Sequence, residues 1–441
     1  MEKIERLYTL FRKSKGVCTD SRADVAGRIF IGLKGESFDG SRFAEDVLNR
    51  GALCAVIGDA DLYSRLGDMD GRLVLVDDTL AALQQLAHRY RQDLKIPFFG
   101  ITGTNGKTTT KELVKAVLSR KYRVAATVGN LNNHIGVPLT LLSIQPSDEI
   151  AIVEMGASAP GEIRSSCLIA DPDYGLVTNV GKAHLQGFGS FEGVKATKGE
   201  LYDYLKAKDG VIVYNADDAE LSSMMQAREL LGVAYGRRVC RADVIETDTP
   251  YLKVRIADGD EISTNLVGDY NINNVLAAVA VGKLFEVPLA DIYAAIRDYQ
   301  PSNNRSQFVS GKTNRIVIDA YNANPISMHV AVANFQRMKA PRKVYVLGDM
   351  RELGDYSLDE HVQMLKEVLS QPSAGIYLVG TEFTRAAESL SLSEADGIRL
   401  FPDSVALRKY LEEHPVEDAV VLIKGSRGIR LEEALEVLKS N

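Results

Sequence analysis

Residues 100–110 read Gly-Ile-Thr-Gly-Thr-Asn-Gly-Lys-Thr-Thr-Thr. The apolar run at 96–99 before them predicts a buried strand, and residues 111–118 after them carry apolar side chains at helical spacing. A glycine-rich turn between a strand and a helix lets backbone N–H groups point into one concavity, to which the helix N-terminus adds the positive end of its dipole. The order strand, glycine loop, lysine, hydroxyl and helix therefore predicts a phosphate cradle in an α/β fold.

Within this loop, Lys107 is expected to reach the outer phosphates of a nucleoside triphosphate, and the Thr108 hydroxyl to hold a magnesium ion. The pattern departs from the common P-loop, which has glycine where Ile101 stands; here the glycines fall at positions 100, 103 and 106. A glycine-rich turn that carries a surface lysine is the alternative interpretation. The spacing, the lysine, the threonine and the flanking elements all favour nucleotide binding.

The composition is that of a globular protein. The chain has 441 residues, 45% of them hydrophobic and 25% charged, and a prior of roughly 150 residues per domain suggests about three domains. The net charge of −7 gives no support to nucleic-acid binding. No apolar run approaches the roughly 18 residues that span a bilayer, and the four scattered cysteines form no C-x-x-C pair. We expect a cytoplasmic monomer without a zinc site or a disulfide framework.

Three α/β domains are expected, at residues 1–82, 83–309 and 310–441. Continuous β-branched runs between helical stretches are typical of a parallel sheet covered on both faces. The expected strands are 28–32, 54–57 and 72–76 in the first domain, 150–154, 175–179 and 210–215 in the second, and 315–319, 343–347, 375–379 and 419–423 in the third. Helices are expected at 80–93, 271–283 and 290–299, and a polar linker at 301–306.

Polar residues end the expected strands of the second domain. Glu154 ends one strand, and Thr178 and Asn179 end the next, with His184 shortly after them. Ligand groups gather at the carboxyl ends of parallel strands, and a carboxylate beside a triphosphate can hold magnesium. His184 could contact a second metal or a phosphate, or be structural. Lys198, in a helical stretch, reads from its neighbours alone as a solvated surface lysine.

Together these motifs resemble the Mur ligase family, the ATP-dependent amide ligases of peptidoglycan precursor synthesis. Residues 103–109 match the family's ATP signature, and the motifs at 154–156, 178–184 and 271–278 follow in the expected order. Within the family, the resemblance is more specifically to the members that add D-alanyl-D-alanine. The stretches that carry this narrower match are 127–138, 319–327, 347–354 and 424–427, with 19–22 and 30–40 in the first domain.

The resemblance implies a fold and a reaction. It implies an N-terminal uridine-nucleotide domain, a central P-loop ATPase-like parallel sheet with helices, and a C-terminal Rossmann-like domain. It also implies that ATP phosphorylates the terminal carboxylate of a UDP-N-acetylmuramoyl-tripeptide, and that D-alanyl-D-alanine attacks the resulting acyl phosphate. Two magnesium ions are expected to screen the anions, and the family usually carries a carbamoylated lysine at the position of Lys198.

The resemblance also assigns site residues. Those for ATP are Gly103, Thr104, Asn105, Gly106, Lys107, Thr108, Thr109, Asn271, Asn274, Arg305 and Asp319. Those for magnesium are Thr108, Glu154, His184 and Lys198, and the catalytic set is Lys107, Lys198, His184 and Glu154. Those for the UDP-substrate are Ser21, Arg22, Lys34, Gly35, Asn130 and Asn133. Those for the dipeptide or for domain closure are Tyr321, Asn322 and Asn324. Helix capping at Asn271 and Asn274, and turn chemistry in the Asn-Ala-Asn-Pro stretch, are the simpler interpretations.

Three other functions fit parts of the sequence. A tripeptide-forming ligase of the same family shares the ATP signature, but the third domain lacks its D-[DN]-P-R motif. A folylpolyglutamate synthetase would leave the first domain unexplained. A nucleotide-binding switch without catalysis would keep the phosphate loop but would not need Glu154, His184 and Lys198 together.

Overall fold

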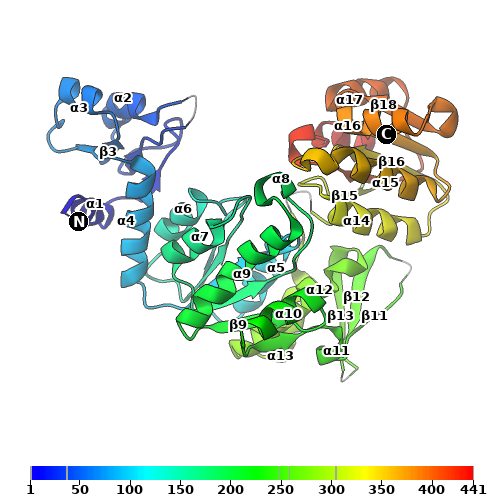
Figure 1. The fold of residues 1–441 in the computed structure, drawn as a ribbon, viewed down its shortest axis with the longest axis horizontal. Coiled ribbons are helices and arrows are strands. Elements are labelled where there is room, and N and C mark those ends of the chain that lie inside the picture. Colours follow the sequence, from blue (N-terminus) through cyan, green and yellow to red (C-terminus); the bar gives the residue numbers. More distant parts are fainter. Residues whose placement is uncertain (1, 36–37, 248, 258, 303–304, 441) are drawn as a thin grey trace.

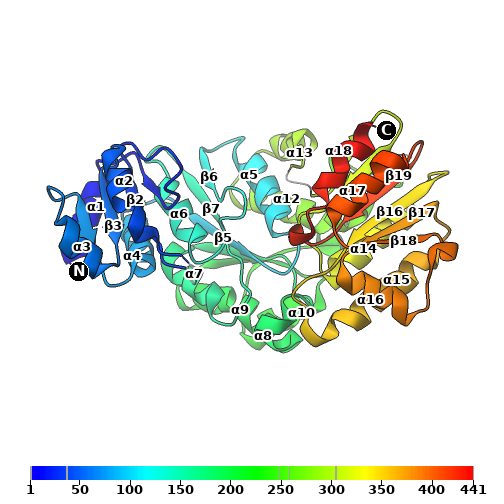
Figure 2. The same ribbon diagram turned by 90° about the horizontal axis from the view of Figure 1, so that it is seen from above.

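The structure is a computed structural model that describes residues 2–35, 38–247, 249–257, 259–302 and 305–440. Its α/β bodies follow one another along the chain and form an arc, with the chain ends on the two outer bodies (Figure 1). Seen from above they lie in a row (Figure 2). The expected α/β class with three domains and parallel sheets is confirmed. The expected boundary between residues 82 and 83 falls inside a helix, and both boundaries stay predictions.

The N-terminal body is a small parallel sheet in the order β1-β2-β3-β4. Its strands are β1 (Val17–Cys18), β2 (Ile29–Ile31), β3 (Cys54–Ile57) and β4 (Leu73–Leu75). Its helices are α1 (Glu2–Phe11), α2 (Ala44–Asn49) and α3 (Ala60–Leu66). The long helix α4 (Thr79–Asp93) begins at the Asp78 side chain, which accepts from the backbone N–H groups of Leu80 and Ala81.

Helix α4 joins the N-terminal body to the next one. Its apolar face packs in a hydrophobic cluster that contains residues of both bodies. Near its end, Arg91 is only 6% exposed. Its guanidinium donates to the carbonyls of Ala170 (2.9 Å), Asp171 (2.7 Å) and Leu94 (3.1 Å). Arg91 therefore fixes the helix on the central body through hydrogen bonds to the backbone carbonyls of Ala170 and Asp171.

We expect Arg91→Met to lower the free energy of unfolding by about 3 kcal/mol, because it removes the donor of the buried Ala170 carbonyl and the ion pair with Asp173. Urea unfolding monitored by circular dichroism measures this. Arg89→Met is the matched control on the same helix, since Arg89 makes only partly exposed ion pairs with Glu5 and Asp93. It should cost less than about 1 kcal/mol, and equal losses in the two variants would contradict the role given to Arg91.

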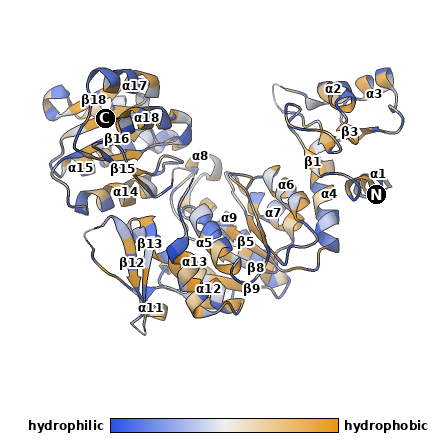
Figure 3. Cartoon of the chain, turned by 180° about the vertical axis from the view of Figure 1, so that it is seen from behind, coloured by the Kyte–Doolittle hydropathy of each residue, from blue (hydrophilic) through white to orange (hydrophobic). Residues whose placement is uncertain are grey.

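The central body contains a parallel sheet in the order β10-β9-β8-β5-β7-β6. Its strands are β5 (Phe98–Thr102), β6 (Val124–Ala126), β7 (Ile150–Glu154), β8 (Tyr174–Val177), β9 (Val211–Asn215) and β10 (Val233–Tyr235). Alternate residues along the strands belong to two hydrophobic clusters, one on each face of the sheet, and each cluster also contains residues of several helices. Helices therefore cover both faces, and hydrophobic residues concentrate in the strands (Figure 3).

The helices of the central body begin with α5 (Lys107–Leu118), which directly follows the loop after β5. The others are α6 (Gly136–Ser143), α7 (Glu162–Ala170), α8 (Leu185–Phe188), α9 (Phe191–Ala207), α10 (Ala219–Ala227), α11 (Arg237–Cys240), α12 (Ile272–Leu284) and α13 (Leu289–Asp298). Because β5 lies between β8 and β7, the loop that follows it sits in the middle of the carboxyl edge of the sheet.

The expected strand at 96–99 is wrong at both ends. Pro97 has no N–H to donate to a strand ladder, so β5 starts at Phe98. The strand then continues through Gly100, where an added Cβ would lie 3.2 Å from Met155 Cε. Gly100 therefore serves packing in the strand, and only Gly103 and Gly106 shape the loop. The expected strand at 175–179 is also too long, because Thr178 and Asn179 leave the sheet and bond to that loop.

A small antiparallel sheet in the central body was not expected from the sequence. It consists of β11 (Asp243–Val244), β12 (Tyr251–Arg255) and β13 (Glu261–Val267). Ile262, Thr264 and Leu266 are buried, while Glu261, Ser263 and Asn265 before and between them are more exposed. This alternation with period two was a signal in the sequence that could have revealed β13.

The C-terminal body has the sheet order β14-β15-β19-β16-β17-β18, parallel except for β14. Its strands are β14 (Gln307–Ser310), β15 (Arg315–Ile318), β16 (Lys343–Gly348), β17 (Gly375–Val379), β18 (Ile398–Phe401) and β19 (Val420–Lys424). Its helices are α14 (Pro325–Arg337), α15 (Ser357–Leu369), α16 (Thr381–Ser389), α17 (Ser404–Glu413) and α18 (Glu432–Ser440). The edge strands β14 and β18 were not expected.

Two residues of the expected linker, Asn303 and Asn304, lie outside the described residues, as does Glu36 in the first domain. Across the part of the chain that is described, no helix combines the length and apolar character needed to cross a membrane.

Candidate active site

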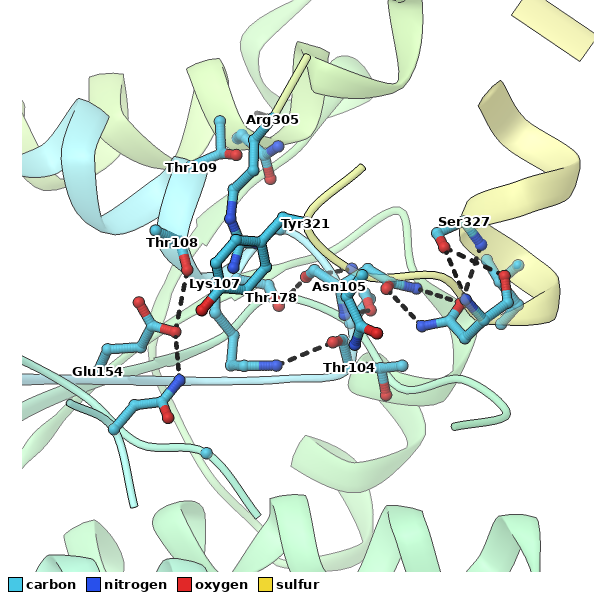
Figure 4. A pocket seen from close by; sticks show the side chains of 18 of the residues that line it. Thr104, Asn105, Lys107, Thr108, Thr109, Glu154, Thr178, Arg305, Tyr321 and Ser327 are labelled. Carbon is cyan, nitrogen blue, oxygen red and sulfur yellow. Dashed lines mark hydrogen bonds between the residues drawn. The ribbon is translucent and has the colours of Figure 1, made fainter. Parts of the chain in front are cut away.

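A cavity of about 700 Å³ lies at the carboxyl edge of the central sheet, where the C-terminal body approaches it (Figure 4). It is lined by most of the residues that the sequence assigned to ATP. The residues assigned to the dipeptide or to domain closure, and two of those assigned to the UDP-substrate, line it as well. The lining includes Thr104, Asn105, Gly106, Lys107, Thr108, Thr109, Asn130, Asn133, Glu154, His184, Asn271, Asn274, Arg305, Asp319, Tyr321, Asn322 and Asn324.

Six selected residues do not line this cavity: Gly103, Lys198, Ser21, Arg22, Lys34 and Gly35. The last four lie in the N-terminal body, where the Arg22 side chain is exposed and paired with Asp20. The backbone N–H of Gly35 donates to the Phe38 carbonyl at 2.7 Å. These four residues therefore lie on a different surface from the phosphate loop, and their assigned role in binding the UDP-substrate stays a prediction.

The phosphate loop is fastened to the loop that follows β8. The N–H of Asn105 donates to Asn179 Oδ1 at 3.0 Å, and its carbonyl accepts from Thr178 Oγ1 at 2.6 Å and Asn179 Nδ2 at 3.0 Å. This close approach needs Gly103, because a Cβ there would lie 2.0 Å from Thr178 Oγ1. The backbone N–H of Thr104 is also taken, by the Asn179 carbonyl. The donors left for phosphate are those at Gly106 and the first turn of α5.

Lys107 opens α5 and folds back over the loop. Its ammonium donates to the carbonyls of Gly103 at 2.6 Å and Thr104 at 2.9 Å. Desolvation lowers the pKa of Lys107 to about 8, with Glu154 acting in the opposite direction. Anionic phosphate oxygens beside this ammonium would favour its charged form.

Glu154, at the end of β7, is 1% exposed. Its Oε1 accepts from Thr108 Oγ1 at 3.1 Å and from Asn132 Nδ2 at 2.8 Å. Its Oε2 is buried and has no hydrogen-bond partner among the described residues. A buried carboxylate oxygen without a donor suits a hard cation. Asn132, to which the sequence assigned no role, orients this carboxylate.

Among the described residues, few side chains around Glu154 could bind a metal ion. No group of three His, Cys, Asp or Glu side chains within the described ranges could hold an ion by itself. The Thr108 hydroxyl can give its proton to Glu154 and still offer an oxygen lone pair to a cation. These residues therefore fit magnesium that takes its remaining ligands from phosphates and water.

His184 lies at the border between two bodies and has a left-handed backbone (φ 51°). Its Nδ1 bonds to the Glu352 carboxylate of the C-terminal body. Desolvation, assisted by Lys107, lowers the pKa of His184, while Glu352 opposes this change. With Nδ1–H facing Glu352, the neutral ring keeps its lone pair on Nε2, which is the form that can bind a metal.

The interpretation of Lys198 as a solvated surface lysine is wrong. Its side chain, on α9, belongs to a residue that is 2% exposed, and its ammonium lies 5.4 Å from the centre of the Phe188 ring. Desolvation, and then the positive charge of Lys107, lower the pKa of Lys198 to about 7. A helical neighbourhood rich in polar residues hid this burial in the sequence.

We expect Lys198→Met to stabilise the fold most at pH 6 and least near pH 10. The folded pKa of about 7 lies below the ordinary value, so between pH 7 and about 10.4 the unfolded chain binds more protons and the wild type gains stability as pH rises. Below pH 7 Lys198 is protonated in both the folded and the unfolded chain, so burial of its charge lowers the free energy of unfolding by the full amount.

The measurement is urea unfolding of both proteins between pH 6 and 10. Lys195→Met on the same helix is the control, because Lys195 pairs with Glu220 at 2.6 Å and its pKa is raised. A difference between Lys198→Met and wild type that does not vary with pH would contradict the lowered pKa.

Asp319 follows β15 and is held by a buried lysine. Lys424 Nζ donates to Asp319 Oδ2 at 2.6 Å and to the Asp319 carbonyl at 3.3 Å. The sequence assigned no role to Lys424, although a lysine at the end of an apolar strand needs a buried partner. The Arg305 guanidinium stacks 3.7 Å from the centre of the Tyr321 ring, and both face the phosphate loop (Figure 4).

The asparagines at the start of α12 bond to each other. Asn274 Nδ2 donates to Asn271 Oδ1 at 2.8 Å, and Asn271 Nδ2 donates to the Val267 carbonyl at 2.9 Å. Asn274 Oδ1 in turn accepts from Thr110 on α5. The amide of Asn271 is therefore occupied within the protein, and its contact with a base stays a prediction that requires these bonds to be exchanged.

The fold and the cavity define a three-domain nucleotide-binding protein whose site is shared between the central and C-terminal bodies. Comparison with family models also divides the chain into three domains. The Mur ligase middle domain matches residues 101–282, the glutamate ligase domain of the Mur ligases matches 304–427, and the catalytic domain of the Mur ligase family matches 13–91.

Individual proteins are similar over nearly the full length. The UDP-N-acetylmuramoyl-tripeptide–D-alanyl-D-alanine ligase of Bacillus subtilis (strain 168) is 34% identical, covering 96% of this chain and 93% of that protein. A crystal structure of MurF from Acinetobacter baumannii has a TM-score of 0.84 at 27% identity, covering 99% and 98% of the two chains. MurF ligase from Thermotoga maritima in complex with ADP has a TM-score of 0.83 at 27% identity, covering 98% of each. The chain belongs to the Mur ligase family.

Proposed function

We propose that this protein is an ATP-dependent ligase that joins D-alanyl-D-alanine to UDP-N-acetylmuramoyl-tripeptide, forming the pentapeptide precursor of peptidoglycan. The observation that carries this proposal is the full-length similarity to a ligase of that name, at 34% identity over 96% of the chain. The ADP complex of a structural neighbour supports ATP as the nucleotide. The phosphate loop, Glu154 and Asp319 around one cavity are the groups such a reaction needs.

The reaction follows from the chemistry of a carboxylate, which is a poor electrophile. The terminal carboxylate oxygen of the tripeptide attacks the γ-phosphorus of ATP, the bond to the bridging oxygen breaks, and ADP leaves. The amine of D-alanyl-D-alanine then attacks the acyl carbon, an amide bond forms, and inorganic phosphate leaves with the electron pair of the C–O bond. Transfer between two anions requires positive charge close by, which Lys107, Arg305 and the N-terminus of α5 supply.

The C-terminal body would complete the site. Asp319, oriented by Lys424, would bind the ATP ribose, and Arg305 would reach the phosphates from its stack on Tyr321. Tyr321, Asn322 and Asn324 would shape the dipeptide site. Because these residues belong to a different body from the phosphate loop, catalysis would depend on closure, which excludes water from the acyl phosphate.

Two magnesium ions would accompany ATP. Thr108 would hold the first, and Glu154 and His184 the second, together with a carbamoylated Lys198. Bound magnesium would neutralise charge on the transferred phosphoryl group. The buried, neutral amine of Lys198 is the form that reacts with carbon dioxide, and the carbamate would turn this side chain into a longer anion.

The UDP-substrate would bridge the N-terminal and central bodies. Ser21, Arg22, Lys34 and Gly35 would contact its uridine nucleotide, and Asn130 and Asn133 the part that reaches the cavity. Asn133 Oδ1 already accepts from the Gly136 N–H at the start of α6, so its Nδ2 is the group left for substrate. A cytoplasmic monomer stays a prediction.

The function is tested by measuring phosphate release with Mg-ATP and UDP-N-acetylmuramoyl-tripeptide, with and without D-alanyl-D-alanine. We expect release that depends on the dipeptide, and a product with the mass of the UDP-pentapeptide, because the acyl phosphate needs an amine acceptor. Release with a single amino acid on a UDP-dipeptide would instead favour the tripeptide-forming ligase. ATP binding without release with any acceptor would favour the switch.

The role of Lys198 has a separate test. Lys198→Ala should be nearly inactive, with a loss of about 100-fold or more typical of a lost metal-binding group, and a short-chain carboxylic acid should partly restore the rate of phosphate release. Lys195→Ala on the same helix should keep its activity and should not respond to the acid. Full activity of Lys198→Ala without added acid would refute the proposal.

A further inference from the structure

The Asn105 side chain points away from Thr178 and Asn179, the two residues to which the Asn105 backbone is bonded. Both backbone groups of this residue are taken by Thr178 and Asn179 of the central body. The side-chain amide is thereby presented to the C-terminal body. There it meets Asn324, which is 7% exposed and lies at the start of α14.

The two amides bond reciprocally across 219 residues of sequence. Asn324 Nδ2 donates to Asn105 Oδ1 at 2.8 Å, and Asn105 Nδ2 donates to Asn324 Oδ1 at 3.4 Å. Asn324 Oδ1 also accepts from the Ser327 N–H at 2.9 Å, which caps α14. The Asn324 side chain thus caps the N-terminus of α14 in the C-terminal body and also contacts the phosphate loop of the central body.

Other polar contacts between the described residues of these bodies, among them the ion pair of Arg337 with Asp269 at 3.2 Å, are of a different kind. His184 bonds to Glu352, whose carboxylate is exposed, and Lys182 lies 3.8 Å from Glu360 with its own side chain largely in solvent. Both depend on charge, and exposed pairs of this kind contribute little. The amide pair is uncharged, less accessible to water, and involves the phosphate loop.

We propose that Asn105 and Asn324 are positioning residues that link the shape of the phosphate loop to docking of the C-terminal body. The inference rests on the proposed function, since it specifies how the closure that the ligase needs is stabilised. The pair forms only when α14 lies against the loop. By linkage, a ligand that stabilises the docked state is bound more tightly when the pair is intact, and less tightly when it is lost.

The variants separate this role from helix capping. Asn324→Ser keeps a good N-cap residue but is too short to reach Asn105. Asn324→Ala loses both the cap and the bridge, so only this variant should also melt at a lower temperature. Asn105→Ala removes the bridge from the other side and leaves the backbone bonds of the loop in place. Lys182→Met, which removes the loose contact with Glu360, is the control for an interaction between bodies that does not involve the loop.

The experiment titrates the full-length protein, saturated with UDP-N-acetylmuramoyl-tripeptide, with Mg²⁺ and a non-hydrolysable ATP analogue, and follows compaction by small-angle scattering. Asn105→Ala and Asn324→Ser should each raise the midpoint roughly fivefold to tenfold, as expected for loss of two neutral hydrogen bonds. The double variant should be no worse than either single one. The KM for ATP should rise by the same factor, and Lys182→Met should stay within about twofold of wild type.

Effects that multiply in the double variant, or a midpoint that no variant changes, would overturn the proposal, because residues acting through one contact cannot be additive. The titration needs no turnover, so it separates the two hypotheses. Wild type that compacts with the expected variant pattern, but releases no phosphate with the dipeptide, would overturn the proposed reaction and support the linkage.

Discussion

The site depends on the backbone of one residue, Asn105, being held by the residues that follow the neighbouring strand. Thr178 and Asn179 satisfy both its N–H and its carbonyl, so the shape of the phosphate loop is set by the protein. The contact is possible because β5 and β8 are adjacent and because Gly103 carries no Cβ. The direction of the Asn105 side chain, the start of α5 and the position of Lys107 all follow from how this backbone is held.

Around that loop, burial changes the charge of several groups. The pKa values of Lys107, Lys198 and His184 are all lowered, chiefly by desolvation, and the lysines also repel each other. Glu154 meanwhile has one buried oxygen that accepts no hydrogen bond from the residues that the structure describes. An anionic nucleotide with its cations would oppose each of these effects: phosphates favour charged lysine, and a metal satisfies the carboxylate. The electrostatics of the protein and of such a ligand are therefore complementary, which is typical of functional sites.

Much of this architecture was predictable, and what was missed has definite causes. Strands β3, β7 and β17 were placed to the residue because continuous apolar runs buried on both faces leave little choice of boundary. The end of β8 was misplaced because Thr178 and Asn179 bond to the loop, and the end of β5 because Gly100 packs within the strand although it resembles a loop glycine. Lys198 was read as exposed because its neighbours are polar, whereas burial depends on how α9 packs. The roles of Asn132 and Lys424 appear only when strands distant in sequence bring their partners close.

The division of the cavity between two bodies has a chemical consequence. A site built wholly on the central sheet could bind and hydrolyse ATP without a partner substrate, since water would reach the phosphoryl group. Here the Asp319 carboxylate is oriented by Lys424, and the Arg305 guanidinium is stacked on Tyr321, so contacts within the protein hold both groups in place. In the proposed reaction, docking of the C-terminal body would bring in preorganised groups and spend little side-chain entropy. The same motion would then produce the reactive geometry and exclude water from the phosphoryl group.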